Sequence, residues 1–221
     1  MASLLLRKGT ADERTMRAVL QHGQYDVAHL NRRSELSQFH QRAIARAQPP
    51  LIIDLGANIG ASALYFNHVW PESRIVAVEP SPDNFSLLKQ NIDGRTNILP
   101  VHAGIASQDG FMRIVDDDAE TDAFKTEPGV GDIPALSMAT LLRDEVGAPF
   151  ICKIDIEGAE RDLFSRDTEW IDQFPLIMIE LHDWMLPGEA ASQNFLKAVA
   201  DRRRDFTFNG ETIFSLRCPI L

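Results

Sequence analysis

A short apolar run that ends in a glycine turn constrains the fold of this chain more than any other segment. Residues 51–55 read Leu-Ile-Ile-Asp-Leu, follow two prolines, and lead into Gly56 and Gly60. A short apolar run of this kind, bounded by proline and glycine, is typical of a strand buried on both faces. Residues 61–70 then carry helical spacing and stop before Pro71. We therefore expect a buried strand, a glycine turn and a helix, in that order.

The same order of elements repeats along the chain. Residues 74–79 predict a second buried strand, Ser81 caps a predicted helix that runs to Ile92, and residues 98–102 predict a third strand. Strands that alternate with helices imply a parallel sheet with right-handed crossovers. The later pattern predicts a hairpin with Ile114 and Val115 that extends from the third strand, helices over 136–145, 159–164 and 190–204, strands over 150–156 and 175–181, and a terminal strand pair, 206–208 and 213–216, turned at Asn209 and Gly210.

Two segments do not follow this alternation. Residues 11–47 are rich in Arg, Gln, His and Glu and contain no proline, so we expect one or two helices there. Residues 116–134 are acidic and rich in Gly and Pro, which predicts a long loop. A lid over a binding site is one interpretation of such a loop, and an insertion without a function is the other.

Composition excludes several classes of protein. The 221 residues include 22 Lys and Arg against 32 Asp and Glu, a net charge of −10 that repels phosphate backbones and anionic lipid. We therefore expect neither nucleic acid nor a membrane as a partner. The chain has only two cysteines, too few for a disulfide scaffold, and its short apolar start is too small for a signal peptide, so a cytoplasmic location is favoured.

The glycine turn predicts a nucleotide-type cofactor at the end of the first strand. Gly56 and Gly60 let the backbone approach a ligand closely, and the following helix aims its first amides at that ligand. The dinucleotide fingerprint G-x-G-x-x-G has its middle glycine where this chain has Asn58, so a nicotinamide-dependent oxidoreductase is the weaker interpretation. Asp54 instead suits a cationic ligand such as the methionine end of S-adenosylmethionine. With Ala57, these residues form the expected cofactor loop.

The ends of the next two strands supply candidates for the nucleoside. Glu79 closes the second strand, where a carboxylate can accept hydrogen bonds from both hydroxyls of a ribose. Asn84 could contact the same nucleoside, or be an ordinary residue of a helical first turn. At the end of the third strand, His102 and Ala103 would form the wall of an adenine site, although a lone histidine there is as easily structural.

A second group of polar residues ends the fourth and fifth strands. Lys153 and Asp155 alternate with apolar residues, and burying them unpaired would be expensive, so they should pair, meet solvent in a cleft, or contact a ligand. Carboxyl strand ends share one edge of a parallel sheet, so we expect four side chains to converge there, namely Asp155, Glu157, Glu180 and His182. They could deprotonate a hydroxyl, with His182 titrating nearest neutral pH. Alternatively, Asp155, Glu180 and His182 could bind a divalent cation such as Mg²⁺.

With these residues in place, the chain resembles the FkbM family of S-adenosylmethionine-dependent methyltransferases. The resemblance runs from Ile53 to His182 and rests on DLGANIG at the glycine turn, AVEPSPDNF at the second strand, KIDIEGAE at the fourth and IELH at the fifth. It implies the Rossmann-like α/β fold of class I methyltransferases, a seven-stranded and mostly parallel sheet with its last strand antiparallel and helices on both faces. It also implies S-adenosylmethionine as the methyl donor and, usually, O-methylation of sugars, polyketides or other natural products.

The expected enzyme transfers a methyl group to a small-molecule or glycan acceptor, with N-methylation and non-catalytic binding of S-adenosylmethionine as alternatives. Residues 1–50 form a helical extension that is part of the acceptor pocket or of an interface. Residues 51–221 form the methyltransferase domain, with 116–134 as an inserted acidic loop. A homodimer and a bound cation are left open. The cofactor group of predicted residues is Asp54, Gly56, Ala57, Asn58, Gly60, Glu79, Asn84, His102 and Ala103, and the acceptor group is Asp155, Glu157, Glu180 and His182.

Overall fold

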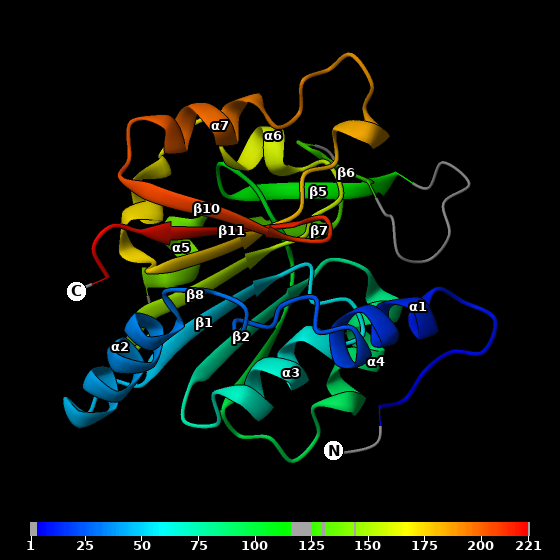
Figure 1. The fold of residues 1–221 in the computed structure, drawn as a ribbon. Helices are drawn as coiled ribbons and strands as arrows, with labels where there is room; N and C mark the ends of the chain where they lie inside the picture. Colours follow the sequence, from blue (N-terminus) through cyan, green and yellow to red (C-terminus); the bar gives the residue numbers. More distant parts are fainter. Residues whose placement is uncertain (1–3, 116–124, 130, 144, 221) are drawn as a thin grey trace.

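The computed structural model describes residues 4–115, 125–129, 131–143 and 145–220, and a seven-stranded sheet lies at its centre (Figure 1). The strands of this sheet are β1 (Pro50–Leu55), β2 (Arg74–Glu79), β3 (Ile98–His102), β8 (Ala148–Ile154), β9 (Leu176–Ile179), β10 (Arg204–Asn209) and β11 (Thr212–Arg217). They lie in the order β10-β11-β9-β8-β1-β2-β3. Neighbours pair in parallel except β11, which is antiparallel to both β9 and β10. The predicted α/β fold, with its last strand antiparallel, is confirmed.

The middle strands form because their apolar residues can be covered on both faces. All six residues of β1 are buried. Ile52 of β1 pairs with Ile75 of β2 on one side and with Ile151 of β8 on the other. These isoleucines pack into one hydrophobic core, while Ile53 and Leu55 of the same strand point into a second core across the sheet. Alternate residues of one strand therefore face two separate cores.

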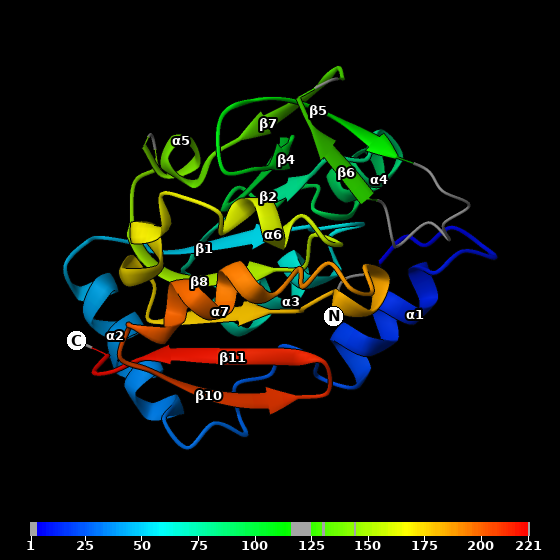
Figure 2. The ribbon, with the colours of Figure 1, turned by 90° about the horizontal axis from the view of Figure 1, so that it is seen from above.

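Helices cover both faces of this sheet, as the alternation of elements predicts (Figures 1 and 2). One face carries α2 (Arg33–Ala45), α3 (Ala61–Val69), α4 (Pro82–Asn91) and the N-terminal turns α1 (Asp12–Met16) and η1 (Arg17–Gln21), of which η1 is π-helical. The other face carries α5 (Met138–Arg143), α6 (Glu160–Leu163), α7 (Gln193–Ala200) and the 3₁₀ turn η2 (Thr168–Gln173). A further 3₁₀ turn, η3 (Asp183–Met185), follows β9. None of the described helices is long and apolar enough to cross a membrane.

Two local features shape the carboxyl edge of the sheet. Ser81 caps α4 as predicted, since its hydroxyl accepts a hydrogen bond from the backbone N–H of Asn84 at 3.4 Å. At the end of β1, Gly56 has a φ of +73°, and a Cβ there would lie 1.8 Å from the carbonyl oxygen of Asp155. Because only glycine allows this approach, the loop after β1 lies directly against the loop after β8.

A second sheet, of four strands, lies beside β2 and away from β10 (Figure 2). Its strands are β4 (Gly104–Ile105), β5 (Gly110–Val115), β6 (Lys125–Pro128) and β7 (Ile133–Leu136), in the order β4-β7-β5-β6. This sheet has a small core of its own. The fully buried side chain of Met112 in β5 packs there against Ile133 and Ala135 of β7.

The second sheet corrects three predictions. The hairpin of Ile114 and Val115 does not extend from the third strand, because β5 pairs with β6 and β7 instead. The segment 116–134, predicted as a loop, contains β6 and the start of β7, and its residues 116–124 and 130 lie outside the described residues. The helix predicted from Leu136 begins at Met138, since Leu136 is the last residue of β7.

The fourth and fifth strands end two residues earlier than predicted, at Ile154 and Ile179. After Ile154 the chain turns away from the sheet, with Asp155 still donating its backbone N–H to the carbonyl of Leu55 at 3.2 Å. Glu157 then takes a left-handed φ of +53°, which starts the turn into α6. Glu180, the first residue after β9, likewise donates its backbone N–H to the carbonyl of Ile154 at 3.0 Å, so Asp155 and Glu180 both stay at the carboxyl edge of the sheet. The helix predicted over 190–204 is also shorter, and α7 begins at Gln193.

Candidate active site

A cavity of about 500 Å³ lies at the carboxyl ends of β1, β2, β8 and β9. Both groups of predicted residues contribute to its walls. From the cofactor group it is lined by Gly56, Ala57, Asn58, Glu79, Asn84 and Ala103. From the acceptor group it is lined by all four residues, Asp155, Glu157, Glu180 and His182. The predicted convergence of the four strand ends is therefore found, while the role of each residue toward a ligand remains a prediction.

Glu79 stands in the cofactor wall, with only 4% of its surface exposed. One carboxylate oxygen accepts the backbone N–H of Asn58 at 2.8 Å, and the other accepts the N–H of Ser81 at 2.9 Å and the side-chain amide of Asn84 at 3.4 Å. Burial raises the pKa of Glu79 to about 7, against the opposing effect of these hydrogen bonds. The carboxylate thus ties the loop after β1 to the cap of α4.

Asn84 is held from the N-terminal segment. Its Oδ1 accepts a hydrogen bond of 2.7 Å from the guanidinium of Arg7. Arg7 is itself fixed by an ion pair of 2.7 Å with Asp12, and that buried carboxylate also accepts the backbone N–H of Arg7. No sequence pattern predicts this contact, because Arg7 and Asn84 are 77 residues apart.

Asp54 lies behind the cavity, fully buried and outside the described lining. Its Oδ2 accepts a hydrogen bond of 2.7 Å from the Ser62 hydroxyl, and its Oδ1 lies 3.3 Å from Nζ of Lys153. Apart from this ion pair, Oδ1 is buried without a hydrogen-bond partner among the described residues, and the carboxylate does not reach the cavity. The predicted contact between Asp54 and a cationic ligand would therefore have to act through the neighbouring lysine and the loop.

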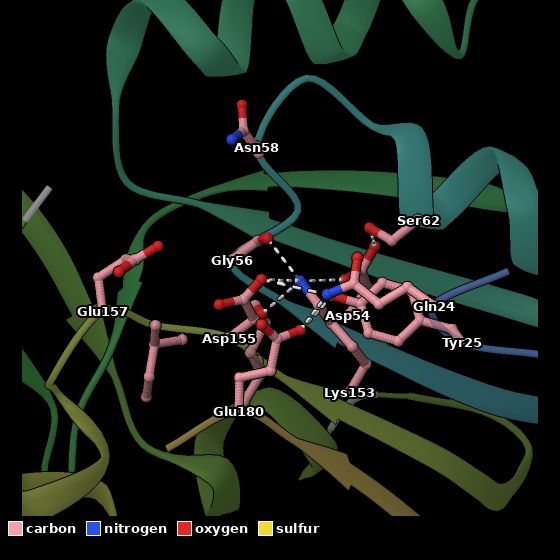
Figure 3. A network of polar contacts seen from close by, with 12 residues as sticks. Gln24, Tyr25, Asp54, Gly56, Asn58, Ser62, Lys153, Asp155, Glu157 and Glu180 are labelled. Carbon is pink, nitrogen blue, oxygen red and sulfur yellow. Dashed lines mark hydrogen bonds and ion pairs between the residues drawn. The ribbon is translucent and has the colours of Figure 1, made fainter. Parts of the chain in front are cut away.

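Lys153 joins the two walls of the cavity (Figure 3). Its Nζ donates hydrogen bonds to the carbonyl oxygens of Gly56 at 2.7 Å and Leu55 at 3.2 Å, and it lies 3.7 Å from Oδ2 of Asp155. Burial lowers the pKa of Lys153, but the charges of Asp54 and Asp155 outweigh burial and raise it above its ordinary value. Of the alternatives that the sequence left open for Lys153 and Asp155, the structure shows an ion pair between them.

Glu180 is fixed by three donors that all reach one carboxylate oxygen. Gln24 donates through Nε2 at 2.5 Å, Tyr25 through its hydroxyl at 3.0 Å, and Thr212 through Oγ1 at 3.2 Å. The Tyr25 oxygen is also 3.3 Å from Oδ2 of Asp155, so this buried phenol stands between two carboxylates (Figure 3). Burial and the charge of Asp155 raise the pKa of Glu180 to about 7.

His182 stands in the same wall, with 5% of its surface exposed. Its Nδ1 is 2.8 Å from a carboxylate oxygen of Glu160, and its Nε2 is 3.5 Å from Asp155 and 3.4 Å from Glu157. Burial lowers the pKa of His182, but the hydrogen bond and charge of Glu160 and the charges of the other two carboxylates raise it to about 9. The expectation that His182 titrates nearest neutral pH is therefore corrected, because Glu180, at about 7, lies nearer.

The predicted cation ligands are only partly brought together. Donor atoms of Asp155, Glu157 and His182 lie within 4.8 Å of one another. Glu180, which was predicted in place of Glu157, does not belong to this group among the described residues, since its contacts are with Gln24 and the residues beside it. The loop after β8 thus supplies two of the three atoms.

Two residues of the cofactor group lie apart from the cavity besides Asp54. His102 is exposed, its ring stacks on Phe85 at a centroid distance of 4.7 Å, and its Nε2 is 3.1 Å from the carbonyl of Pro80. Gly60 lies at the start of α3, where a Cβ would be 2.7 Å from a methyl group of Leu88. Both residues therefore have structural contacts that explain them without a ligand.

Part of the cavity wall comes from residues that the sequence did not mark. The N-terminal segment contributes Arg14, Thr15, Ala18, Val19, Gln24 and Tyr25, and two further residues, Trp184 and Glu211, come from the C-terminal half. Trp184 is 71% exposed although it lines the cavity. A tryptophan that is exposed beside buried carboxylates could have indicated this part of the wall, but recognising it requires the burial of each residue, which the sequence alone does not supply.

Comparison with known proteins assigns the chain to a family. A family model described as the methyltransferase FkbM domain matches residues 54–208, which is more than half of the chain and includes the end of β1 and all of β8 and β9. The chain belongs to the FkbM methyltransferase family. The resemblance predicted from the glycine turn and the KIDIEGAE motif is confirmed.

Relatives of this FkbM protein are methyltransferases of fungi and archaea. "Methyltransferase 1" of Beauveria bassiana is 26% identical over 170 residues, which cover 60% of this chain and 64% of that protein. A hexuronic acid methyltransferase of Haloferax volcanii is 28% identical over 141 residues, covering 62% of this chain and 57% of that protein. The FkbM chain thus spans less than two thirds of the length of these two relatives. Among solved structures, fibrillarin of Aeropyrum pernix with bound S-adenosylmethionine is 13% identical, with a TM-score of 0.46, over 79% of this chain and 72% of that chain.

Proposed function

We propose that this FkbM-family protein transfers a methyl group from S-adenosylmethionine to a hydroxyl of a sugar or another small molecule. One observation carries the proposal: a single cavity has the glycine loop and Glu79 on one wall and four acceptor-group residues on the other. Carboxyl strand ends are where open α/β sheets bind their ligands. A donor and an acceptor bound to these two walls would meet inside the same 500 Å³ space.

The cofactor wall fits S-adenosylmethionine by its chemistry. Oε2 of Glu79 accepts one hydrogen bond and keeps acceptor capacity, so it can also accept from a ribose hydroxyl. Oδ1 of Asn58 is buried without a partner among the described residues, and a ligand donor would satisfy it. The ammonium and sulfonium charges suit a cavity lined by carboxylates, including Asp155 and Glu211.

The acceptor wall would bind and activate the hydroxyl. S-adenosylmethionine supplies the reactive methyl group, so the protein has to position the acceptor oxygen in line with it and let the hydroxyl proton leave. Asp155 and Glu180, held by Lys153 and Tyr25, can accept a hydrogen bond from that hydroxyl. A divalent cation held by the same wall would acidify the hydroxyl further.

The acceptor class is supported by two observations. A relative of this chain is named as a hexuronic acid methyltransferase. Trp184 presents a largely exposed indole at the cavity, and an aromatic face beside hydrogen-bonding carboxylates suits a sugar ring, which has both apolar C–H faces and hydroxyl edges. Six residues between Arg14 and Tyr25 also line the cavity, so the N-terminal extension would form part of the acceptor pocket, one of the two roles expected from the sequence.

The test is a screen of acceptors with purified full-length protein. S-adenosylhomocysteine release is followed with hexuronic acids, neutral hexoses, other polyhydroxylated compounds and primary amines, and each product is analysed by mass spectrometry. We expect release with a hydroxylated acceptor that gains one methyl group on oxygen. Methylation of the amines alone would show an N-methyltransferase. Binding of S-adenosylhomocysteine without turnover on any acceptor would support a non-catalytic protein instead.

A further inference from the structure

Three metal-binding side chains meet at one point of the acceptor wall. Asp155 and Glu157 follow β8, and His182 follows β9. Each residue offers one donor atom, and these atoms lie within 4.8 Å of one another. His182 Nε2 is 3.5 Å from Oδ1 of Asp155 and 3.4 Å from Oε2 of Glu157. All three residues line the cavity, so an acceptor in the cavity could contact a cation bound by them.

These separations suit ligands of one cation better than direct hydrogen bonds. Two atoms bound about 2.1 Å from a cation lie roughly 3.0 Å apart at an octahedral right angle and roughly 3.4 Å apart at a tetrahedral angle. The distances from Nε2 of His182 are close to this range. By contrast, the hydrogen bond on the other side of the same ring measures 2.8 Å. A cation between the three side chains would therefore need only small movements of the ligands.

A buried carboxylate behind His182 provides a second, independent indication. Glu160 is 1% exposed, and its Oε1 accepts from Nδ1 of His182 at 2.8 Å. A carboxylate in this position fixes the ring so that Nε2 faces the other two ligands, and it makes the imidazole a better donor to a metal. The second oxygen, Oε2, is buried without a partner among the described residues. A buried polar atom without a partner needs an explanation, and a ligand beside the three side chains would supply one.

We propose that Asp155, Glu157 and His182 bind a divalent cation of the Mn²⁺ type, with Glu160 orienting the histidine. Two carboxylates balance the charge of a dication. A ligand set of one imidazole and two carboxylates suits Mn²⁺ better than Mg²⁺, because Mg²⁺ prefers sites in which every ligand is oxygen. The protein supplies three ligands, so the remaining positions are open to water or to an acceptor hydroxyl from the cavity. The catalytic part of this inference rests on the proposed function, whereas cation binding does not.

In this arrangement the cation would have two effects on the acceptor. Binding to the hydroxyl oxygen would fix that oxygen at the carboxyl edge of the sheet, facing the cofactor wall across the cavity. It would also withdraw electron density from the O–H bond, so that the proton leaves more readily to water or a nearby carboxylate. Lys153, which contacts both Asp155 and Gly56, would keep the ligand loop in register with the cofactor loop.

The test measures cation binding directly. Full-length protein freed of metal with EDTA is titrated with Mn²⁺, and free Mn²⁺ is followed by its electron paramagnetic resonance signal. We expect one bound Mn²⁺ per chain, and a loss of affinity of at least tenfold in both Asp155→Asn and His182→Gln. Glu160→Gln, which preserves the shape of the side chain but not its charge, should weaken binding by about 10- to 100-fold. Glu211→Gln removes a carboxylate of the same cavity outside the ligand group and should bind as the wild type does.

Each outcome decides the matter. Circular dichroism and thermal melting of every variant establish that it is folded before its binding is compared. Wild-type affinity no better than that of His182→Gln, or equal losses in Glu211→Gln and Asp155→Asn, would overturn the site. Calorimetry with S-adenosylhomocysteine in the presence of EDTA separates this inference from the proposed function. Cofactor binding and full methyl transfer in EDTA would refute the catalytic role of the cation alone, whereas Mn²⁺ binding without methyl transfer would refute only the proposed function.

Discussion

Glu79→Gln is the perturbation that most directly tests how the cofactor wall works. The substitution keeps the size of the side chain and removes its charge. In the wild type both carboxylate oxygens already accept protein donors, the backbone N–H of Asn58 on one side and that of Ser81 on the other. A glutamine has one carbonyl oxygen, so its NH₂ group must face one of these two donors. One buried N–H then loses its partner.

The expected magnitude follows from those hydrogen bonds. An unsatisfied buried N–H costs about 1–3 kcal/mol, which is partly offset because a buried amide is easier to desolvate than a carboxylate. Each hydrogen bond from a ribose hydroxyl to a charged acceptor contributes about 1.5–3 kcal/mol. Losing the charge and one acceptor should therefore weaken the binding of S-adenosylhomocysteine by roughly 10- to 100-fold. The effect on unfolding should be the smaller of the two.

Binding is measured by calorimetry as a function of pH. Burial raises the pKa of Glu79 from its ordinary 4.5 to about 7, so the neutral form is favoured in the folded protein. By linkage, this group makes the fold less stable as pH rises from about 4.5 to about 7. Binding has the opposite trend, because the carboxylate is the better acceptor for ribose hydroxyls. Affinity in the wild type should rise as pH increases through about 7 and then level, and Glu79→Gln should lack that rise.

A matched control comes from Asp83, an exposed carboxylate of the same helix cap. Asp83→Asn removes one negative charge near the cofactor wall without touching the network of Glu79. It should bind S-adenosylhomocysteine within a factor of about two of the wild type, as expected for a solvent-exposed charge. If Glu79→Gln bound as tightly as Asp83→Asn at every pH, ribose recognition by Glu79 would be refuted.

Three further predictions concern the walls of the cavity. Gly94 has a left-handed φ but open space around it, so Gly94→Ala should lower the free energy of unfolding in urea by about 1 kcal/mol. Gly56→Ala should lower it clearly more, because the new Cβ would meet a backbone oxygen. Equal losses in the two variants would contradict the close approach of the two loops. Tyr25→Phe removes a donor to buried Glu180 and should destabilise the protein by about 1–3 kcal/mol, whereas an unchanged melt would show that this hydrogen bond is absent in solution. Trp184→Ala should raise the KM for a sugar acceptor and leave the affinity for S-adenosylhomocysteine unchanged, with Trp184→Phe in between; equal KM values would remove the indole from acceptor binding.

The large sheet could be predicted because each strand is determined by its own residues. The ranges 74–79 and 98–102 are the observed β2 and β3. Pro71 and Pro80 flank the first of these ranges, and the second is apolar apart from His102, although Pro100 lies inside it. The glycine loop could also be predicted, because the backbone of Gly56 comes so close to the loop after β8 that only glycine fits at this position.

The small sheet could not be predicted in the same way. The strand β6 contains Pro128, and β7 contains Pro134, and residues of this kind indicate a loop when only neighbours in sequence are considered. The strand β6 tolerates its proline because it lies at the edge of the four-stranded sheet, where one side makes no ladder hydrogen bonds. Its existence depends on pairing with β5, across the segment 116–124, and that pairing has no signature in a local pattern.

The cofactor wall of the cavity could be predicted from the sequence, whereas most of the contacts that build the acceptor wall could not. The cofactor wall is built from strand ends and the loops that directly follow them, so a contiguous motif of a few residues predicts the methyl donor. The acceptor wall depends on partners far apart in sequence, such as Tyr25 and Gln24 on Glu180, separated by 155 and 156 residues. A tyrosine in the N-terminal segment has no pattern that would mark it as a partner of a carboxylate on the fifth strand. Because residues 14–25 and Trp184 complete that wall, exchanging them should change the acceptor while the binding of the methyl donor, held by Glu79 and the glycine loop, stays as it is.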